Sequence, residues 1–217
     1  AVSRVEGISR IRLGSLEPRI ITEEFLEGIV KTGKVCPHFH LSLQSGCNKT
    51  LKNMNRRYSA QEYAEKCELI RKFYPAPALT TDVIVGFPQE TEEDFEETLD
   101  VVSKCGYDTA FTFLYSRRSG TPAAEMEQIP QDVAKERFNR LLALVQQEGR
   151  IRSSRFEGSV QEVLVEEESR EKGIFTGRTE YNLLVHFPGT ADLLGKYVKV
   201  SLDECHGFYY MGSLVEE

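Results

Sequence analysis

Hydrophobic and polar positions follow their clearest pattern between residues 79 and 101. The run Val83-Ile84-Val85 is short, apolar and β-branched, and it ends at a Gly-Phe-Pro turn, which is typical of a strand buried on both faces. Thr91 followed by Asp94 predicts the capping box of a helix, whose apolar positions then recur at helical spacing. A strand, a tight loop and an acid-capped helix together predict one β-α unit of a parallel α/β protein.

Strand-like and helix-like patterns alternate over the rest of the first 156 residues. Besides residues 82–86, strand-like patterns cover 9–16, 39–43 and 107–115. Helix-like patterns cover residues 22–30, 48–56, 59–73 and 131–156. Strands separated by helices indicate parallel β-α units, so we expect four parallel strands in one sheet with helices beside it.

The period of the pattern changes after residue 156. Five short strand-like runs follow, at residues 160–166, 173–179, 181–187, 196–202 and 207–215. Short strands separated by Gly, Asn or Pro predict a small all-β module, here a five-stranded antiparallel barrel. We therefore predict two domains, one of parallel β-α units over residues 1–150 and a β-barrel over residues 151–217.

Composition narrows the class of protein. The 217 residues are 40% apolar and 28% charged, which is ordinary for a soluble globular protein. No apolar run reaches the roughly 20 residues of a membrane span, and the N-terminal sequence lacks the pattern of a signal peptide, so we expect a cytoplasmic protein. A net charge of −7 argues against a broad nucleic-acid-binding surface and leaves room for a local basic patch.

The cysteines do not form a metal-binding loop in the sequence. Their odd number and long, irregular gaps indicate reduced thiols in a cytosolic protein. No two of them have the CxxC or CxxxC spacing of a zinc or iron–sulfur motif. The five are Cys36, Cys47, Cys67, Cys105 and Cys205.

Asp82 is the unexpected residue of the central strand. A charge beside a buried apolar run must be partnered or functional, so Asp82 either serves a site or caps a neighbouring loop. A TIM-barrel enzyme that uses Asp82 or Glu90 as a general base ranks last among our readings, because no second acid–base partner stands at a matching position.

Five stretches occur in a fixed order along the first domain. They are LGSLEP at 13–18, HLSLQSGC at 40–47, MNRRY at 54–58, TDVIVGFP at 81–88, and FLYS at 113–116 with GTPAA at 120–124. Together they resemble the radical S-adenosylmethionine (SAM) methylthiotransferases that modify tRNA. This resemblance implies that residues 1–150 form a partial TIM-like α/β barrel. GRT at 177–179 and GKYVKV at 195–200 resemble the C-terminal TRAM module of that family, an OB-like β-barrel.

The chain departs from this family in two respects. The family has an N-terminal domain and a CxxxCxxC loop for a [4Fe–4S] cluster, and this sequence contains neither, so we expect a fragment that begins near the third barrel strand. The signal for the subfamily is mixed. Residues 15–18 and 40–47 resemble enzymes that act on threonylcarbamoyladenosine, whereas residues 107–124 and 177–188 resemble those that act on isopentenyladenosine, both at position 37 of tRNA.

The resemblance implies four residues that bind SAM. Asp82 would accept hydrogen bonds from the ribose hydroxyls, and Gln44 would add a second polar contact to the nucleoside. Arg56 would pair with the methionine carboxylate, and Ser15 would bond the amino-acid end. Without the resemblance, Arg56 is a solvated charge at a helix end, Gln44 completes a turn and Ser15 ends a strand. His40 either faces the barrel interior near a substrate or is a structural histidine held by hydrogen bonds.

Candidate RNA contacts lie in both domains. Arg117 and Arg118, beside a Gly-Pro loop, are either phosphate contacts or a solvated pair. In the β-module the residues to test are Arg178, Lys196 and Lys199, with Tyr181 and Tyr209 as stacking partners. Residues 150–217 hold eight Lys or Arg and twelve Asp or Glu, which departs from a strongly basic RNA binder.

Two main functions therefore remain open. The first is part of a tRNA methylthiotransferase that adds a methylthio group to C2 of a hypermodified adenosine, with SAM and [4Fe–4S] clusters in the full-length parent, tRNA as partner, and no cluster or activity in the fragment alone. The second is a non-catalytic RNA-binding or scaffold protein. In either case, a barrel cut before its third strand exposes an edge, so we expect self-association.

Overall fold

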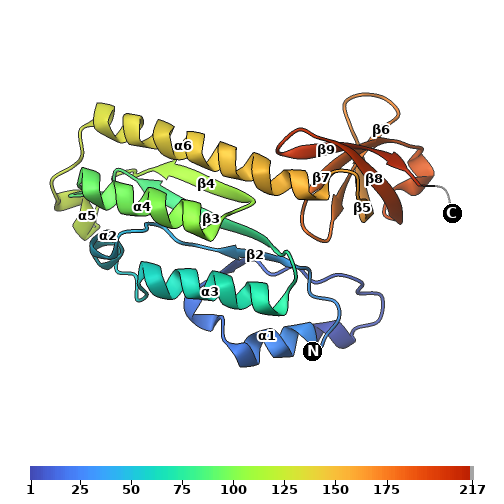
Figure 1. Cartoon of the computed structure of the whole chain (residues 1–217), viewed down its shortest axis with the longest axis horizontal. Helices are drawn as coiled ribbons and strands as arrows, with labels where there is room; N and C mark the ends of the chain where they lie inside the picture. Colours follow the sequence, from blue (N-terminus) through green and yellow to red (C-terminus); the bar gives the residue numbers. More distant parts are fainter. Residues whose placement is uncertain (216–217) are drawn as a thin grey trace.

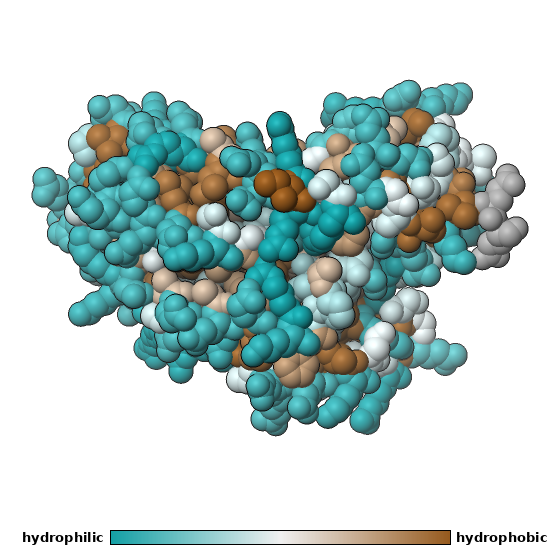
Figure 2. Space-filling view, viewed as in Figure 1, coloured by the Kyte–Doolittle hydropathy of each residue, from teal (hydrophilic) through white to brown (hydrophobic). Residues whose placement is uncertain are grey.

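The structure is a computed structural model that describes residues 1–215. Figure 1 shows a layered α/β part at the N-terminal side and a small β-barrel at the C-terminal side, with the long helix α6 (Gln131–Ser153) leading from one to the other. Among the described residues, no helix is long and apolar enough to cross a membrane. The visible face is mostly hydrophilic, with small separate hydrophobic patches (Figure 2).

The first part is built on one parallel four-stranded sheet in the order β1-β2-β3-β4. The predicted architecture of parallel β-α units is therefore confirmed. Its first strand is much shorter than predicted, because only two residues pair with β2 and residues 9–14 contribute just an isolated bridge at Ile11. The strands are β1 (Ser15–Leu16), β2 (His38–Leu41), β3 (Ala78–Val85) and β4 (Thr109–Leu114).

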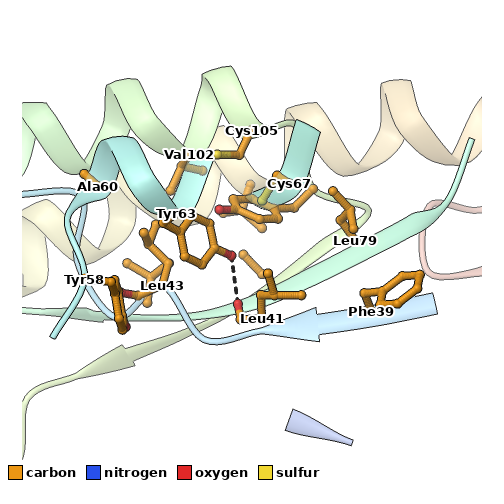
Figure 3. Close-up of a cluster of buried hydrophobic side chains, with 14 of the residues drawn as sticks. Phe39, Leu41, Leu43, Tyr58, Ala60, Tyr63, Cys67, Leu79, Val102 and Cys105 are labelled. Carbon is orange, nitrogen blue, oxygen red and sulfur yellow. Dashed lines mark hydrogen bonds between the residues drawn. The ribbon is translucent and has the colours of Figure 1, made fainter. Parts of the chain in front are cut away.

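Helices pack against one face of this sheet and enclose the main core. Tyr63 lies at its centre, fully buried, and its hydroxyl donates a hydrogen bond to the carbonyl of Leu41 over 2.8 Å (Figure 3). The capping box predicted for residues 91–94 is present at the start of α4. The helices are α1 (Glu23–Val30), α2 (Asn48–Asn53), α3 (Ala60–Phe73), α4 (Glu92–Cys105), α5 (Pro122–Glu125) and α6.

The opposite face of the sheet is open. Alternation along β3 directs Leu79 and Val83 into the core, while Asp82 and Ile84 stay partly exposed on the other side. Residues of β4 that pair with them remain about half exposed, Phe111 at 51% and Phe113 at 49%. This face combines polar and aromatic groups, which makes it the natural place for a binding site.

The second part is a closed five-stranded barrel in the order β5-β6-β7-β9-β8. The predicted barrel is confirmed, although β7 and β9 are parallel rather than antiparallel. Strand β8 lies between β7 and β9 along the chain and runs in the opposite direction, so β9 runs in the same direction as β7 when the barrel closes. The strands are β5 (Val160–Glu168), β6 (Ile174–Thr179), β7 (Leu184–Pro188), β8 (Tyr197–Cys205) and β9 (Tyr209–Leu214).

Hydrogen bonds fix the barrel against the sheet domain. The guanidinium of Arg10 donates to the carbonyls of Arg178 and Glu162, and that of Arg12 donates to the carbonyls of Thr179 and Glu180. At the end of α6, the buried hydroxyl of Tyr210 donates to the carbonyl of Ser153. The predicted division between residues 150 and 151 falls in the last turn of α6 and stays a prediction.

Candidate functional site

Asp82 lies on β3 with its carboxylate on the open face of the sheet. It accepts hydrogen bonds from the Ser42 hydroxyl over 3.1 Å and from Nε2 of His40 over 3.1 Å. Nδ1 of the same imidazole lies 2.9 Å from the Thr80 hydroxyl. Both bonds to Asp82 end on Oδ2, so Oδ1 accepts no hydrogen bond from residues 1–215. The side chain is held in place by these bonds, one of which comes from the loop after β2, and it keeps one acceptor for a ligand.

A cleft of about 850 Å³ opens at the carboxyl ends of β2, β3 and β4. Gln44, Arg56 and Asp82, three of the four predicted cofactor residues, line it together with Arg118. Ligands of parallel sheets bind at this end because the strand ends and their loops present polar groups there. Its apolar wall comes from Ile84, Phe87, Phe113 and Leu114.

The position of Gln44 follows from its backbone. Its N–H donates to the carbonyl of Asp82 over 2.8 Å, and its own carbonyl accepts from the N–H of Ile84 over 2.9 Å. The residue has a φ of 69°, in the left-handed region, so the chain leaves the sheet directly after this bridge. Gln44 is 7% exposed, and this small exposed part borders the cleft.

Ser15 does not line this cleft. It borders a second pocket, on the same open face but between the sheet and the β-barrel, which it shares with His40 and Asp82. The sequence placed Ser15 beside the cofactor because relatives have a residue there. In the structure Ser15 lies on the short edge strand β1, paired with His40, and its cofactor role stays a prediction.

Glu90 is not available as a general base. Its side chain is 1% exposed and lies 3.2 Å from the guanidinium of Arg137, which also bonds Glu92. Its carboxylate accepts from the N–H of Gly86 over 2.9 Å and so anchors the loop after β3. Burial raises the pKa of Glu90, while the Gly86 N–H and Arg137 oppose that rise. The residue is part of the support for the cleft.

The predicted RNA contacts fall into three groups. Arg117 and Arg118 lie exposed in the loop after β4, and Arg118 borders the cleft. Arg178 lies on β6, pairs with Glu166 over 3.2 Å and lines the pocket between the two domains. Lys196 pairs with Asp192 over 3.7 Å, and Lys199 lies on β8.

The sequence did not indicate two residues of the inter-domain pocket, His38 and Arg12. The signal was present in the alternation His-Phe-His along residues 38–40, which places both imidazoles on one face of β2. It was missed because the partner wall comes from the β-barrel, more than a hundred residues later in the chain.

No group of three or more His, Cys, Asp or Glu that could hold a metal ion occurs within residues 1–215. Four of the cysteines are at most 3% exposed, and none borders the cleft. The residues present therefore do not fit an iron–sulfur cluster, whereas the mixed polar and apolar lining of the cleft fits a nucleoside cofactor.

Two family models match separate parts of the chain. Residues 4–102 match the family model of the radical SAM superfamily, and residues 154–215 match that of the TRAM domain. Coproporphyrinogen III oxidase from Escherichia coli, described as a radical SAM enzyme, has a similar structure with a TM-score of 0.54 at 16% identity, over 79% of this chain and 46% of that one. At this identity the likeness shows the fold alone.

Relatives of high sequence identity match the whole chain. It is 49% identical to the tRNA-2-methylthio-N(6)-dimethylallyladenosine synthase of Lachnoclostridium phytofermentans, over 100% of this chain and 48% of that protein. It is 44% identical to the protein of the same name from Clostridium botulinum, over 97% of this chain and 47% of that protein. The chain thus spans about half the length of these relatives. It contains part of a radical SAM domain followed by a TRAM domain, and it is similar along almost its whole length to these two synthases.

Proposed function

We propose that this chain is the SAM-binding and RNA-binding portion of a tRNA methylthiotransferase. The observation that carries the proposal is the meeting of Gln44, Arg56 and Asp82 in one cleft at the carboxyl ends of parallel strands. The three residues come from separate loops and strands, and each has a role implied by the family resemblance. The high identity to relatives with that activity supports the same assignment.

SAM, when bound and cleaved, supplies the reactive and methyl groups of this chemistry. In the proposed complex Oδ1 of Asp82 accepts from the ribose hydroxyls, because Oδ2 is already bonded to His40 and Ser42. The guanidinium of Arg56 pairs with the methionine carboxylate, and Gln44 contacts the nucleoside. Ile84 and Phe113 provide the apolar wall against the purine.

The substrate we propose is N6-dimethylallyladenosine, the isopentenyl-modified base at position 37 of tRNA. Both relatives carry this base in their names, which favours it over threonylcarbamoyladenosine. The TRAM domain supplies tRNA contacts in this proposal, and the site of action is the cytoplasm, where tRNA is modified. The chain alone is expected to be inactive, because its residues do not fit the cluster that cleaves SAM.

The test replaces Asp82 with Asn in the full-length parent. The change keeps the size of the side chain and removes the charge, so binding of SAM should weaken by about one to two orders of magnitude, from roughly 1.5–3 kcal/mol per charge-assisted bond. The readouts are reductive cleavage of SAM at limiting cofactor and mass spectrometry of nucleosides from the tRNA product. Arg56→Ala should weaken the same cofactor through its carboxylate end.

Arg178→Ala, on the barrel, is the matched change away from the cleft. It should leave SAM cleavage at the wild-type rate and weaken tRNA binding, with a smaller dependence on salt because one phosphate contact is lost. If Asp82→Asn cleaves SAM normally while Arg178→Ala abolishes cleavage, the assignment of a cofactor half and an RNA half is wrong. Tight RNA binding with no methylthio product in the wild-type parent would instead favour a non-catalytic RNA-binding protein.

A further inference from the structure

A pocket of about 640 Å³ lies between the open face of the sheet and the β-barrel. Its walls come from both domains, with Arg12, His38 and Phe111 on the sheet side and Arg178 and Phe208 on the barrel side. It shares Asp82 with the cofactor cleft, so the two hollows meet on the same face of β3. The roles assigned to the cofactor cleft do not account for this pocket.

His38 is the unusual residue of this pocket. It is 7% exposed, and its Nδ1 is buried without a hydrogen-bond partner within residues 1–215. His40, two residues further along the same strand, has both ring nitrogens bonded. Burial lowers the pKa of His38 to about 4, helped by the charge of Arg12, so the ring is neutral at pH 7. A neutral imidazole offers one donor and one acceptor, which suits the edge of a nucleobase.

Aromatic and cationic groups surround this imidazole. Phe208 is 73% exposed at the turn between β8 and β9, and Phe111 is 51% exposed on β4. Tyr181 lines the same pocket. Arg178 uses Nε for Glu166 and Nη1 for the carbonyl of Asn182 over 3.4 Å, which leaves further N–H groups of its five for another acceptor. Exposed aromatic faces stack on bases, and guanidinium groups bind phosphates.

We propose that this pocket binds one unpaired nucleotide of the RNA substrate. The base stacks on Phe208 and Phe111 and bonds the ring of His38, and its phosphate lies against Arg178. The inference rests on the proposed function, because it takes RNA as the ligand and adds a second nucleotide site beside the cofactor cleft. It also explains how an acidic chain holds RNA, since the cations act inside a pocket formed by two domains and not across a basic surface.

Two variants of the full chain test this site. Phe208→Ala removes an exposed ring and leaves the fold intact, while His38→Phe replaces the unbonded imidazole with an apolar ring. Each should weaken binding of a fluorescent RNA hairpin with an unpaired loop by about tenfold, as expected for the loss of one stacking or hydrogen-bonding contact. The thermal midpoint of His38→Phe should equal or exceed that of the wild type, because an unsatisfied buried polar atom has been removed.

The controls are Ile151→Ala, which removes an exposed apolar side chain outside the pocket, and His186→Phe, which breaks the 2.9 Å bond between Nδ1 and the Thr176 hydroxyl. The first should leave affinity and stability unchanged, and the second should lower the thermal midpoint while keeping affinity. Photolabelling with 8-azidoadenosine 5′-monophosphate should mark peptides that contain Tyr181 or Phe208.

Wild-type affinity in both pocket variants overturns the inference, as does labelling confined to other peptides or the absence of binding of either probe. A His38→Phe variant that loses stability and keeps its affinity shows a structural role for His38 and also overturns it. These outcomes are independent of SAM cleavage in the full-length parent. The nucleotide site and the proposed enzymatic function therefore fail separately.

Discussion

At the scale of single residues, the buried ion pair between Arg137 and Glu90 supports the cleft. Their side chains are 6% and 1% exposed, and Arg137 also donates to the Glu90 carbonyl over 2.9 Å. Removing one partner of a buried pair leaves an uncompensated charge, which costs about 3–5 kcal/mol. We expect Arg137→Leu to lower the free energy of unfolding by about this amount at pH 7, as measured by urea unfolding.

The pH dependence of this variant has a definite sign. Without Arg137, burial raises the folded pKa of Glu90 further, so the folded state binds its proton more tightly than the unfolded state. The stability that Arg137→Leu removes should be small at pH values below the pKa of Glu90 in the unfolded chain. It should grow as the pH rises through that pKa. Glu90→Gln in the same chain should restore part of the lost stability. Arg140→Ala, at an exposed pair, should cost less than about 1 kcal/mol, and an equal cost for both arginines would contradict this account.

The sequence identified the polar residues that line the cleft better than it identified their hydrogen-bond partners. Asp82 was found because a charge beside a buried β-branched run is rare, and Arg56 and Gln44 were found through the family resemblance. The bonds from His40 and Ser42 to Asp82 depend on strand register, which no local pattern encodes. Arg178 was selected as a barrel cation, and no local pattern indicates that it faces the sheet domain.

At the scale of elements, the N-terminus of α4 ties together two parts of the sheet domain. Asp94 accepts from the N–H of Thr91 over 2.8 Å, from Lys49 over 2.6 Å and from the thiol of Cys47 over 3.2 Å. Burial alone would raise the pKa of Asp94, but these three donors outweigh it and lower the pKa to about 2. The carboxylate therefore binds the helix start and α2 in its charged form.

This shift predicts the acid stability of the fold. Because the pKa of Asp94 is lower in the folded state, its charged carboxylate stabilises the fold at pH values above the unfolded pKa of about 4. This stabilisation is lost as the pH falls towards the folded pKa of about 2. The gain is at most about 2 kcal/mol, because Lys49 is half exposed and screened by solvent. Asp94→Asn should flatten the loss of stability between pH 4 and pH 2 in urea titrations. An identical pH profile for the variant and the wild type would show that the cap does not depend on its charge.

Elements with a strong local pattern were predicted well, and elements defined by distant pairing were not. The capping box at Thr91, the buried run of β3 and the five barrel strands follow from periodicity and turn residues. Residues 9–14 alternate like a strand, but Arg10 and Arg12 are drawn into bonds with barrel carbonyls instead of continuing the sheet ladder. The parallel pairing of β7 with β9 arises only from closure of the barrel.

At the scale of the whole molecule, the sheet has two short or open edges. β1 has only two paired residues, and β4 carries the half-exposed Phe111 and Phe113. Such edges and apolar faces recruit other chains. We expect the isolated chain to self-associate with rising concentration in sedimentation velocity. A monodisperse monomer at all concentrations would remove this argument.

The positions of the cysteines predict that this chain does not hold an iron–sulfur cluster. Iron–sulfur clusters need three or four thiolates from neighbouring positions, usually on one loop. Here Cys67 and Cys105 contact each other in the core of the sheet domain, which makes a pair and not a set of three. Cys36 is buried just before β2, Cys47 is buried at the start of α2, and Cys205 lies on β8 of the barrel. Burial raises the pKa of Cys36 and of Cys47, which disfavours the thiolate that binds iron. Anaerobic reconstitution of this chain with iron and sulfide should therefore give no stoichiometric cluster by metal and acid-labile sulfide analysis. The full-length parent, treated in the same way, should retain one.

A stoichiometric cluster in this chain would require these cysteines to leave the core, and loss of its folded near-ultraviolet circular dichroism would then accompany cluster binding.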